Sequence, residues 1–180
     1  MARLLSVLAL TVAAVSQVVH AASCHSSTGH MQMVTYVKRH PEYTREEFWE
    51  YWETQHAPKV APLAAHFNIT RYQQIQVGGQ ILPTAGGSSR PASNVTVEFD
   101  GIAMFLYKSA DVLTEMLSHP YYINVVEPDE HVFIDKAAFG TGMVATFIGS
   151  QVEVVNERKD VWIGDESVRA QYQEVFDSYQ

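Results

Sequence analysis

The sequence predicts an α+β fold in which strands and helices follow one another in the order β-α-β-β-α-β. Two observations carry this prediction. Four segments are rich in β-branched and aromatic residues, and two segments with helical periodicity stand after the first and the third of them. The chain has 180 residues, 47% hydrophobic and 18% charged, which is enough for one domain with a sizeable core.

The four strands are expected at residues 31–39, 69–77, 95–107 and 141–153. Asp100 and Gly101 interrupt the apolar run of the third strand. This point is either a bulge or turn, or an acid with a partner or a function, and the sequence leaves both readings open. The loop at 78–93 holds four glycines and two prolines and has no periodicity, so it is either a lid or a simple insertion.

The segment from Phe48 to Pro58 is the most informative stretch of the chain. At about 100° per residue, Tyr51, Trp52 and His56 fall on one aromatic face, and glutamates occupy the opposite face. Pro58 disfavours helix at the residue before it, so we expect this helix to stop near His56. A histidine at a helix end beside indoles is a candidate for proton transfer. The alternative is a core histidine that hydrogen-bonds a carbonyl.

The second helix is predicted over 110–117, and a short helical turn is expected to start at Glu127. The tail at 156–180 is polar, with a terminal helix expected over 166–179. This order of elements is that of a split βαβ, or ferredoxin-like, unit with both helices on one side of an antiparallel sheet. The other sheet face would be bare and apolar, so we expect a homodimer that packs sheet on sheet, a dimeric α/β barrel.

The N-terminus is typical of a signal peptide over residues 1–21, with one arginine, an apolar run and cleavage after Ala21. The run is short for a spanning helix, so an uncleaved anchor is the less favoured alternative, and no stable membrane insertion is expected. Residues 22–30 form a loose segment, and the folded domain is expected over 31–155. The protein is therefore expected to be secreted or resident in the secretory pathway.

Three further features bear on that compartment and on partners. Cys24 is the sole cysteine, which excludes an intramolecular disulfide. Asn68 and Asn94 each begin a glycosylation triplet, and a signal peptide would bring both sites to the glycosylation enzymes of the secretory pathway. The formal net charge of -8 argues against nucleic acid and anionic membrane surfaces as partners.

Several motifs of known chemistry are missing from the sequence. It contains no Gly-rich phosphate loop, no His-Glu-x-x-His helix and no Gly-x-Ser-x-Gly elbow. The histidines show no metal-ligand spacing, so we expect no metal and no cofactor. A metal site at His56 with Asp100 is a less favoured alternative. The missing motifs leave two kinds of function open: proton transfer without a cofactor, or simple ligand binding.

Three motifs lie in order along the chain. They are Phe48-x-x-Tyr-Trp-x-x-x-His-x-Pro58, Phe99-Asp-Gly-Ile-Ala103 and Pro128-Asp-Glu-x-x-Phe-x-Asp135. Together they resemble the EthD family. The resemblance implies the dimeric barrel fold. It also implies, for fungal members, tailoring of aromatic polyketides as decarboxylases, dehydratases or cyclases without a cofactor. Other members accompany oxidative ether-degrading systems. The leader and the tail after residue 153 depart from the family pattern.

Both lines of reasoning lead to one mechanistic hypothesis. A flat aromatic or polyketide substrate binds in a pocket, His56 transfers a proton, and Asp100 orients the imidazole. The pocket is expected to be lined by Tyr51, Trp52, Tyr72 and Phe105. The competing class is a non-catalytic protein that binds an aromatic metabolite or supports an oxygenase. A third reading, the least favoured, is haem handling with His56 or His119 as axial ligand.

Overall fold

The structure, a computed structural model, describes residues 28–86 and 88–180. Its central sheet contains four strands in the order β2-β5-β1-β6, and all three neighbouring pairs are antiparallel. Their bounds are β1 (Met31–Val37), β2 (Arg71–Ile75), β5 (Gly101–Tyr107) and β6 (Met143–Ser150). This is the ferredoxin-like order, so the predicted α+β fold class is confirmed. The predicted signal peptide and Cys24 lie outside the described residues.

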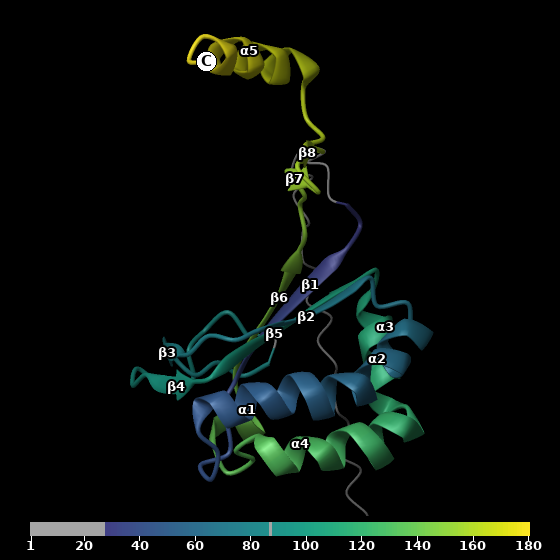
Figure 1. Ribbon diagram of the computed structural model, residues 1–180, viewed down its shortest axis with the longest axis vertical. Helices are drawn as coiled ribbons and strands as arrows, with labels where there is room; N and C mark the ends of the chain where they lie inside the picture. Colours follow the sequence, from purple (N-terminus) through teal and green to yellow (C-terminus); the bar gives the residue numbers. More distant parts are fainter. Residues whose placement is uncertain (1–27, 87) are drawn as a thin grey trace, which may run out of the picture.

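Two helical layers cover one side of the sheet (Figure 1). The first comprises α1 (Arg45–Tyr51), the π-helical turn η1 (Trp52–His56) and α2 (Ala57–His66). The second comprises α3 (Ala110–Ser118), the π-helical turn η2 (Tyr122–Val126) and α4 (Glu127–Phe133). Thr44 and Glu47 form a capping box at the start of α1, which satisfies backbone donors that have no helical partner.

The expectation that the first helix stops near His56 is wrong. The backbone N–H of Ala57 donates to the carbonyl of Trp52, five residues earlier, and the helix continues. This wide turn accommodates the proline that follows, because Pro58 has no N–H to donate and its ring needs room beside the preceding turn. The second layer repeats the device: Glu127 bonds to Tyr122 in the same way, just before Pro128.

The predicted third strand is divided at Asp100 into two separate strands. β4 (Val97–Phe99) pairs with β3 (Gly79–Ile81) in a small hairpin, whereas β5 pairs with β1 and β2. The loop between β3 and β4 reaches the far edge of the main sheet, where Thr84 forms a parallel bridge with Ala145. A 3-10 turn, η3 (Phe139–Gly142), leads into β6.

The core between the sheet and the first helical layer is aromatic. Phe48 and Trp52 are buried, and their rings lie 5.4 Å apart. Phe133 of α4 completes the cluster at 5.6 Å from the Phe48 ring. Gly101 allows this packing, because a Cβ at that position would lie 2.5 Å from a carbon of the Trp52 ring.

None of the helices within residues 28–86 and 88–180 lies over the opposite face of the sheet (Figure 1). Because side chains alternate along a strand, it carries the side chains that point away from the helices. We call this surface the outer sheet face; its partly or fully exposed apolar members are Val34, Tyr36, Ile75, Ile102, Met104 and Phe147. Ile75 and Phe147 are each 38% exposed, so apolar area is open to solvent in the single chain.

The C-terminal part stands apart from the sheet and helices (Figure 1). It consists of a hairpin of β7 (Val155–Asn156) and β8 (Lys159–Asp160), followed by α5 (Glu166–Asp177). The predicted terminal helix is thus confirmed. Across residues 28–86 and 88–180, none of the helices combines the length and apolarity that crossing a bilayer requires.

Candidate active site

A cavity of about 220 Å³ lies between the sheet and the two helical layers. Its walls are largely apolar and come from all four strands of the sheet and from η1, α2, α3, η2 and α4. Four side chains with proton-transfer chemistry line it: His56, Tyr72, Tyr122 and Glu130. An apolar cavity of about 150 Å³ holds benzene, so this one has room for a substituted or fused aromatic ring. A mostly apolar cavity with a few polar groups is the usual form of a small-molecule site.

His56 is held at the wall of this cavity by Asp129. The imidazole is 5% exposed, and its Nδ1 lies 2.8 Å from Oδ2 of Asp129 on α4. Its ring also packs against Phe133, with centroids 4.8 Å apart. His56 is the last residue of the π-helical turn η1, and the second such turn, η2, ends three residues before Asp129. Each member of the pair is therefore close to one of the two wide turns.

The carboxylate of Asp129 is the centre of a hydrogen-bond network. Its Oδ1 accepts from the hydroxyl of Tyr51 at 2.8 Å and from the ammonium of Lys59. Burial alone would raise the pKa of Asp129, but the bonds from Lys59, His56 and Tyr51 bring it below its ordinary value. Burial also raises the pKa of Tyr51 to about 12. Asp129 is therefore an ionised acceptor at neutral pH.

This environment fixes the protonation state of the histidine. Burial lowers the pKa of His56, against the opposing effects of Asp129 and Glu130, so the ring is neutral at pH 7. Because an ionised carboxylate can only accept, Nδ1 carries the proton and donates it to Asp129. The lone pair then lies on Nε2. A neutral imidazole in this tautomer is suited to act as a general base.

Asp100 does not orient His56, contrary to the sequence prediction. It is buried at the other end of α1, where its Oδ1 accepts from Nε and Nη2 of Arg45 at 3.1 and 3.0 Å. The backbone N–H of Arg39 donates to Oδ2 at 3.3 Å, and Lys38 lies 3.8 Å from the same oxygen. The sequence left two interpretations of Asp100 open, a turn in the strand or an acid with a partner. Both apply, because Asp100 lies at the break between two strands and has charged partners.

The predicted lining residues divide into two groups. Trp52, Tyr72 and Phe105 line the cavity, and the rings of Tyr72 and Phe105 are stacked at 4.4 Å. Tyr51 is not among the lining residues. Its hydroxyl binds Asp129 instead, and its ring packs on Phe133.

A second buried acid was missed in the sequence. Glu130 is 7% exposed and lines the cavity. Its Oε1 accepts from the hydroxyl of Tyr122 at 3.0 Å and its Oε2 from the ammonium of Lys136 at 2.6 Å. Burial raises the pKa of Tyr122, and the charge of Glu130 adds to that effect, so this phenol stays protonated.

A signal for both missed acids exists in the sequence. Val126, Asp129, Glu130 and Phe133 have the spacing i, i+3, i+4, i+7, which places two carboxylates on an apolar helix face. An acid on such a face needs a partner. The partner could not be identified from spacing, because His56 lies 73 residues away in the chain.

The predicted glycosylation sites are both accessible. Asn68 and Asn94 are exposed, and Asn68 has a positive φ of 54° just after α2, where asparagine is well tolerated. Glycosylation itself stays a prediction, as do the expectations that no metal and no cofactor take part.

With this geometry established, comparison with known proteins is informative. The EthD domain family matches residues 40–137, more than half of the chain. The chain belongs to the EthD family. A curated relative, the conidial pigment biosynthesis dehydratase EthD of Metarhizium robertsii, is 26% identical over 99 residues, which cover 55% of this chain and 70% of that protein. The region of this chain that matches the family contains both His56 and Asp129.

This chain also has a low similarity to solved structures. A dimeric protein of unknown function and ferredoxin-like fold from Bacteroides fragilis has a TM-score of 0.42 and 9% identity, over 71% of this chain and all of that one. An EthD-like protein from Ralstonia eutropha has a TM-score of 0.39 and 16% identity, over 73% of this chain and 96% of that one. The fold assignment rests on the sheet order described above.

Proposed function

We propose that this EthD-family protein is a dehydratase that tailors an aromatic or polyketide metabolite, with His56 as its base. The observation that carries the proposal is the His56–Asp129 pair in the wall of an otherwise apolar cavity. The name of the Metarhizium robertsii relative, a dehydratase of pigment biosynthesis, supports the same reaction class.

The proposed step is loss of water from a β-hydroxy ketone. Nε2 of His56 removes a proton from the carbon between the carbonyl and the hydroxyl-bearing carbon, which gives an enolate. The enolate collapses to a carbon–carbon double bond, the carbon–oxygen bond breaks, and the leaving hydroxyl takes the proton from His56 and departs as water. Asp129 stabilises the transient imidazolium and keeps the ring oriented. Positioned acid–base groups of this kind contribute about 10²- to 10⁴-fold.

Tyr72 is proposed to bind the carbonyl oxygen that becomes the enolate. Its hydroxyl accepts from Nε2 of Gln74 at 2.9 Å, and the same Nε2 also donates to the backbone carbonyl of Trp52. With that bond accepted, the phenol proton is available to a substrate. Burial raises the pKa of Tyr72 to about 12, so the proton is present at neutral pH.

The test is incubation of purified protein with candidate β-hydroxy polyketones, followed by mass spectrometry for loss of water. We expect His56→Ala to lose at least about 10²-fold in turnover while the protein still folds. Tyr72→Phe keeps the ring and removes only the hydroxyl, so it should lower kcat and leave folding intact. Full turnover in the His56 variant would refute the assignment. Binding without turnover in the parent protein would favour the metabolite-binding alternative.

Assembly is the second part of the proposal. The apolar outer sheet face, with Ile75 and Phe147 exposed, supports a homodimer that packs two such faces together and closes the α/β barrel. Light scattering of the purified protein measures the mass directly. Ile75→Asp should weaken the dimer, because it places a charge in an apolar interface.

A further inference from the structure

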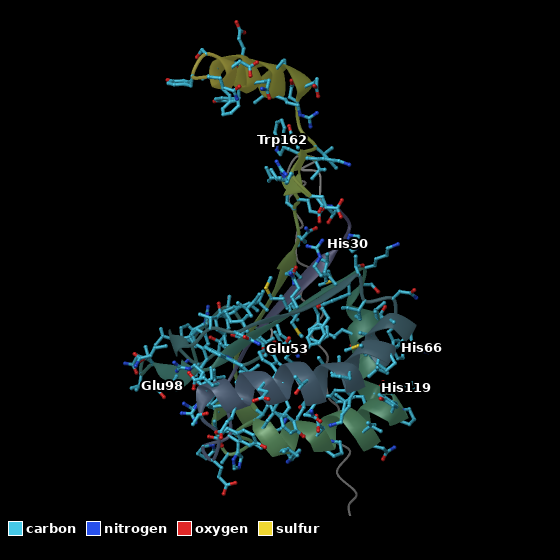
Figure 2. All side chains as sticks on the ribbon, viewed as in Figure 1. His30, Glu53, His66, Glu98, His119 and Trp162 are labelled. Atoms are coloured by element: carbon cyan, nitrogen blue, oxygen red, sulfur yellow. The ribbon has the colours of Figure 1, made fainter. Side chains whose placement is uncertain are left out.

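The last 30 residues form a protrusion that extends away from the sheet and helices, and its first residue, Gln151, hydrogen-bonds Thr28 and His30 beside the start of β1. We call residues 151–180 the C-terminal arm; it contains β7, β8 and α5 and extends beyond the end of β6 (Figure 1). No residue of the arm is buried. Figure 2 shows α5 and its side chains standing away from the sheet and from the other helices of the described residues. A folded helix with no core beneath it needs an explanation.

The arm is nevertheless a built unit. Arg169 of α5 forms an ion pair with Asp160 of β8 at 3.1 Å and donates to the carbonyl of Trp162. Its guanidinium also lies 6.0 Å from the ring of Trp162, which sits at the base of the helix (Figure 2). Asp165 caps α5 by accepting from the backbone N–H of Ser167 at 2.7 Å. These contacts orient the helix relative to the hairpin.

The helix itself is amphipathic. At about 100° per residue, Val168, Tyr172, Val175 and Phe176 fall within one arc of about 100°, while the charged residues lie elsewhere on the circumference. We call these four residues the α5 stripe; each is at least 39% exposed. Helices of about 12 residues are marginal on their own in water, and α5 has 12. Its stability therefore depends on an apolar surface that covers the stripe.

The residues described at 28–86 and 88–150 do not cover the stripe, and the place where the arm leaves the sheet favours a second copy as its partner. Exposed apolar side chains continue from the outer sheet face along the chain into the arm: Phe147, then Val152, Val154, Val155 and Ile163, followed by the α5 stripe. The path begins on the outer sheet face, where a second copy is proposed to pack. A partner on that face lies beside the origin of the arm. An anionic membrane is disfavoured, because α5 carries three acidic residues and one basic residue on a chain of net charge -8.

We propose that the C-terminal arm reaches across to a second copy of this chain and that the α5 stripe packs against it. Two-fold symmetry makes the contact reciprocal, so each arm clasps the other protomer. The inference rests on the homodimer proposed above, and it adds a second contact region that is separate from the sheets.

The first experiment asks whether the stripe touches another copy. A benzophenone amino acid replaces Tyr172, and ¹⁴N- and ¹⁵N-labelled protein are mixed before photo-crosslinking. We expect crosslinked peptides of mixed isotope, which arise only between copies. Crosslinks confined to one copy, or no crosslinks between copies, would overturn the proposal.

The second experiment measures the dimer dissociation constant by analytical ultracentrifugation. Phe176→Glu should raise it about ten- to a hundredfold, because it puts a charge in the centre of the stripe. Ala170→Glu adds the same charge on the opposite, exposed side of α5 and should leave it unchanged. Equal constants for the two variants would overturn the arm contact while the sheet-to-sheet dimer stands. A monomeric parent protein would overturn both, and the dehydration assay would still test the active site independently.

Discussion

The substitution Asp129→Asn isolates the contribution of one carboxylate to the proposed base. In the parent protein this carboxylate accepts from Nδ1 of His56 and thereby leaves the lone pair on Nε2. An amide can instead donate to Nδ1, which moves the ring proton to Nε2 and disables the base. Loss of the corresponding carboxylate in a Ser-His-Asp triad costs about 10⁴-fold in kcat. We therefore expect a loss of about 10²- to 10⁴-fold here.

The same substitution should change the titration of His56 in a defined direction. The hydrogen bond and the charge of Asp129 both raise the pKa of His56 against the dominant effect of burial. Without them the pKa falls further below its ordinary value. Each unit of that change corresponds to about 1.36 kcal/mol of differential interaction.

The cost in folding stability should be moderate. Asp129 accepts three side-chain bonds, and a hydrogen bond to a charged group is worth about 1.5–3 kcal/mol. Lys59 is 35% exposed and can turn to water, and asparagine keeps one acceptor oxygen. We expect a loss of about 1–3 kcal/mol in the free energy of unfolding, measured in urea.

Nitrogen-15 NMR of the imidazole reports both tautomer and pKa and needs no substrate. The matched control is Asp100→Asn, which removes a buried carboxylate distant from His56, in a cluster with Arg45 and Arg39. Asp100→Asn should lower the free energy of unfolding by about 1–3 kcal/mol. The loss is limited to this range because the partly exposed cations beside residue 100 regain contact with water. The titration of His56 should stay unchanged. An unaltered His56 ring in Asp129→Asn, or the same alteration in both variants, would refute the reasoning.

Three further outcomes are expected. Burial lowers the pKa of His56 below 6.5, so the rate of turnover should rise with pH and reach its plateau before pH 6.5. The contribution of neutral His56 to folding stability should be complete above pH 6.5 and disappear as the pH falls through the lowered pKa. A rate still rising above pH 7 would contradict a neutral base. Gly101→Ala forces a methyl group against Trp52 and should cost about 1–3 kcal/mol, seen as a lower urea midpoint. Protein secreted by a eukaryotic host should begin after residue 21 and lose mass on glycosidase treatment, unless Asn68 and Asn94 are replaced by glutamine.

The sheet was predictable because its signal is local. Alternation and β-branched residues over 31–39 and 141–153 identified β1 and β6 within a few residues. The division at Asp100 was not resolved, because an acid in an apolar run fits either a turn or a buried ion pair. Only the position of Arg45 in space shows that both apply.

The active site was predictable by half. Periodicity placed His56 on the aromatic face of its helix, and the structure has it there. The rule that ends helices before proline failed at Pro58, since it assumes a regular α-helical turn, and a π-helical turn removes the conflict. The prediction that Asp100 is the partner of His56 was wrong for a different reason. A linear pattern does not indicate which of two distant acids, Asp100 or Asp129, folds against a given side chain.

The proline-linked wide turns have a consequence for how this pair could be lost. Each turn amounts to one inserted residue, so a chain lacking a single residue in η1 or η2 could form an unbroken α-helix with conventional bonding. Every side chain on one flank of the deletion would then rotate by about 100° relative to the other flank. Such a protein could keep its sheet and its helices, yet His56 and Asp129 would no longer face each other across the layers. In this protein, a change of one residue in the length of a helix would thus disturb the proposed chemistry as much as the replacement of a side chain.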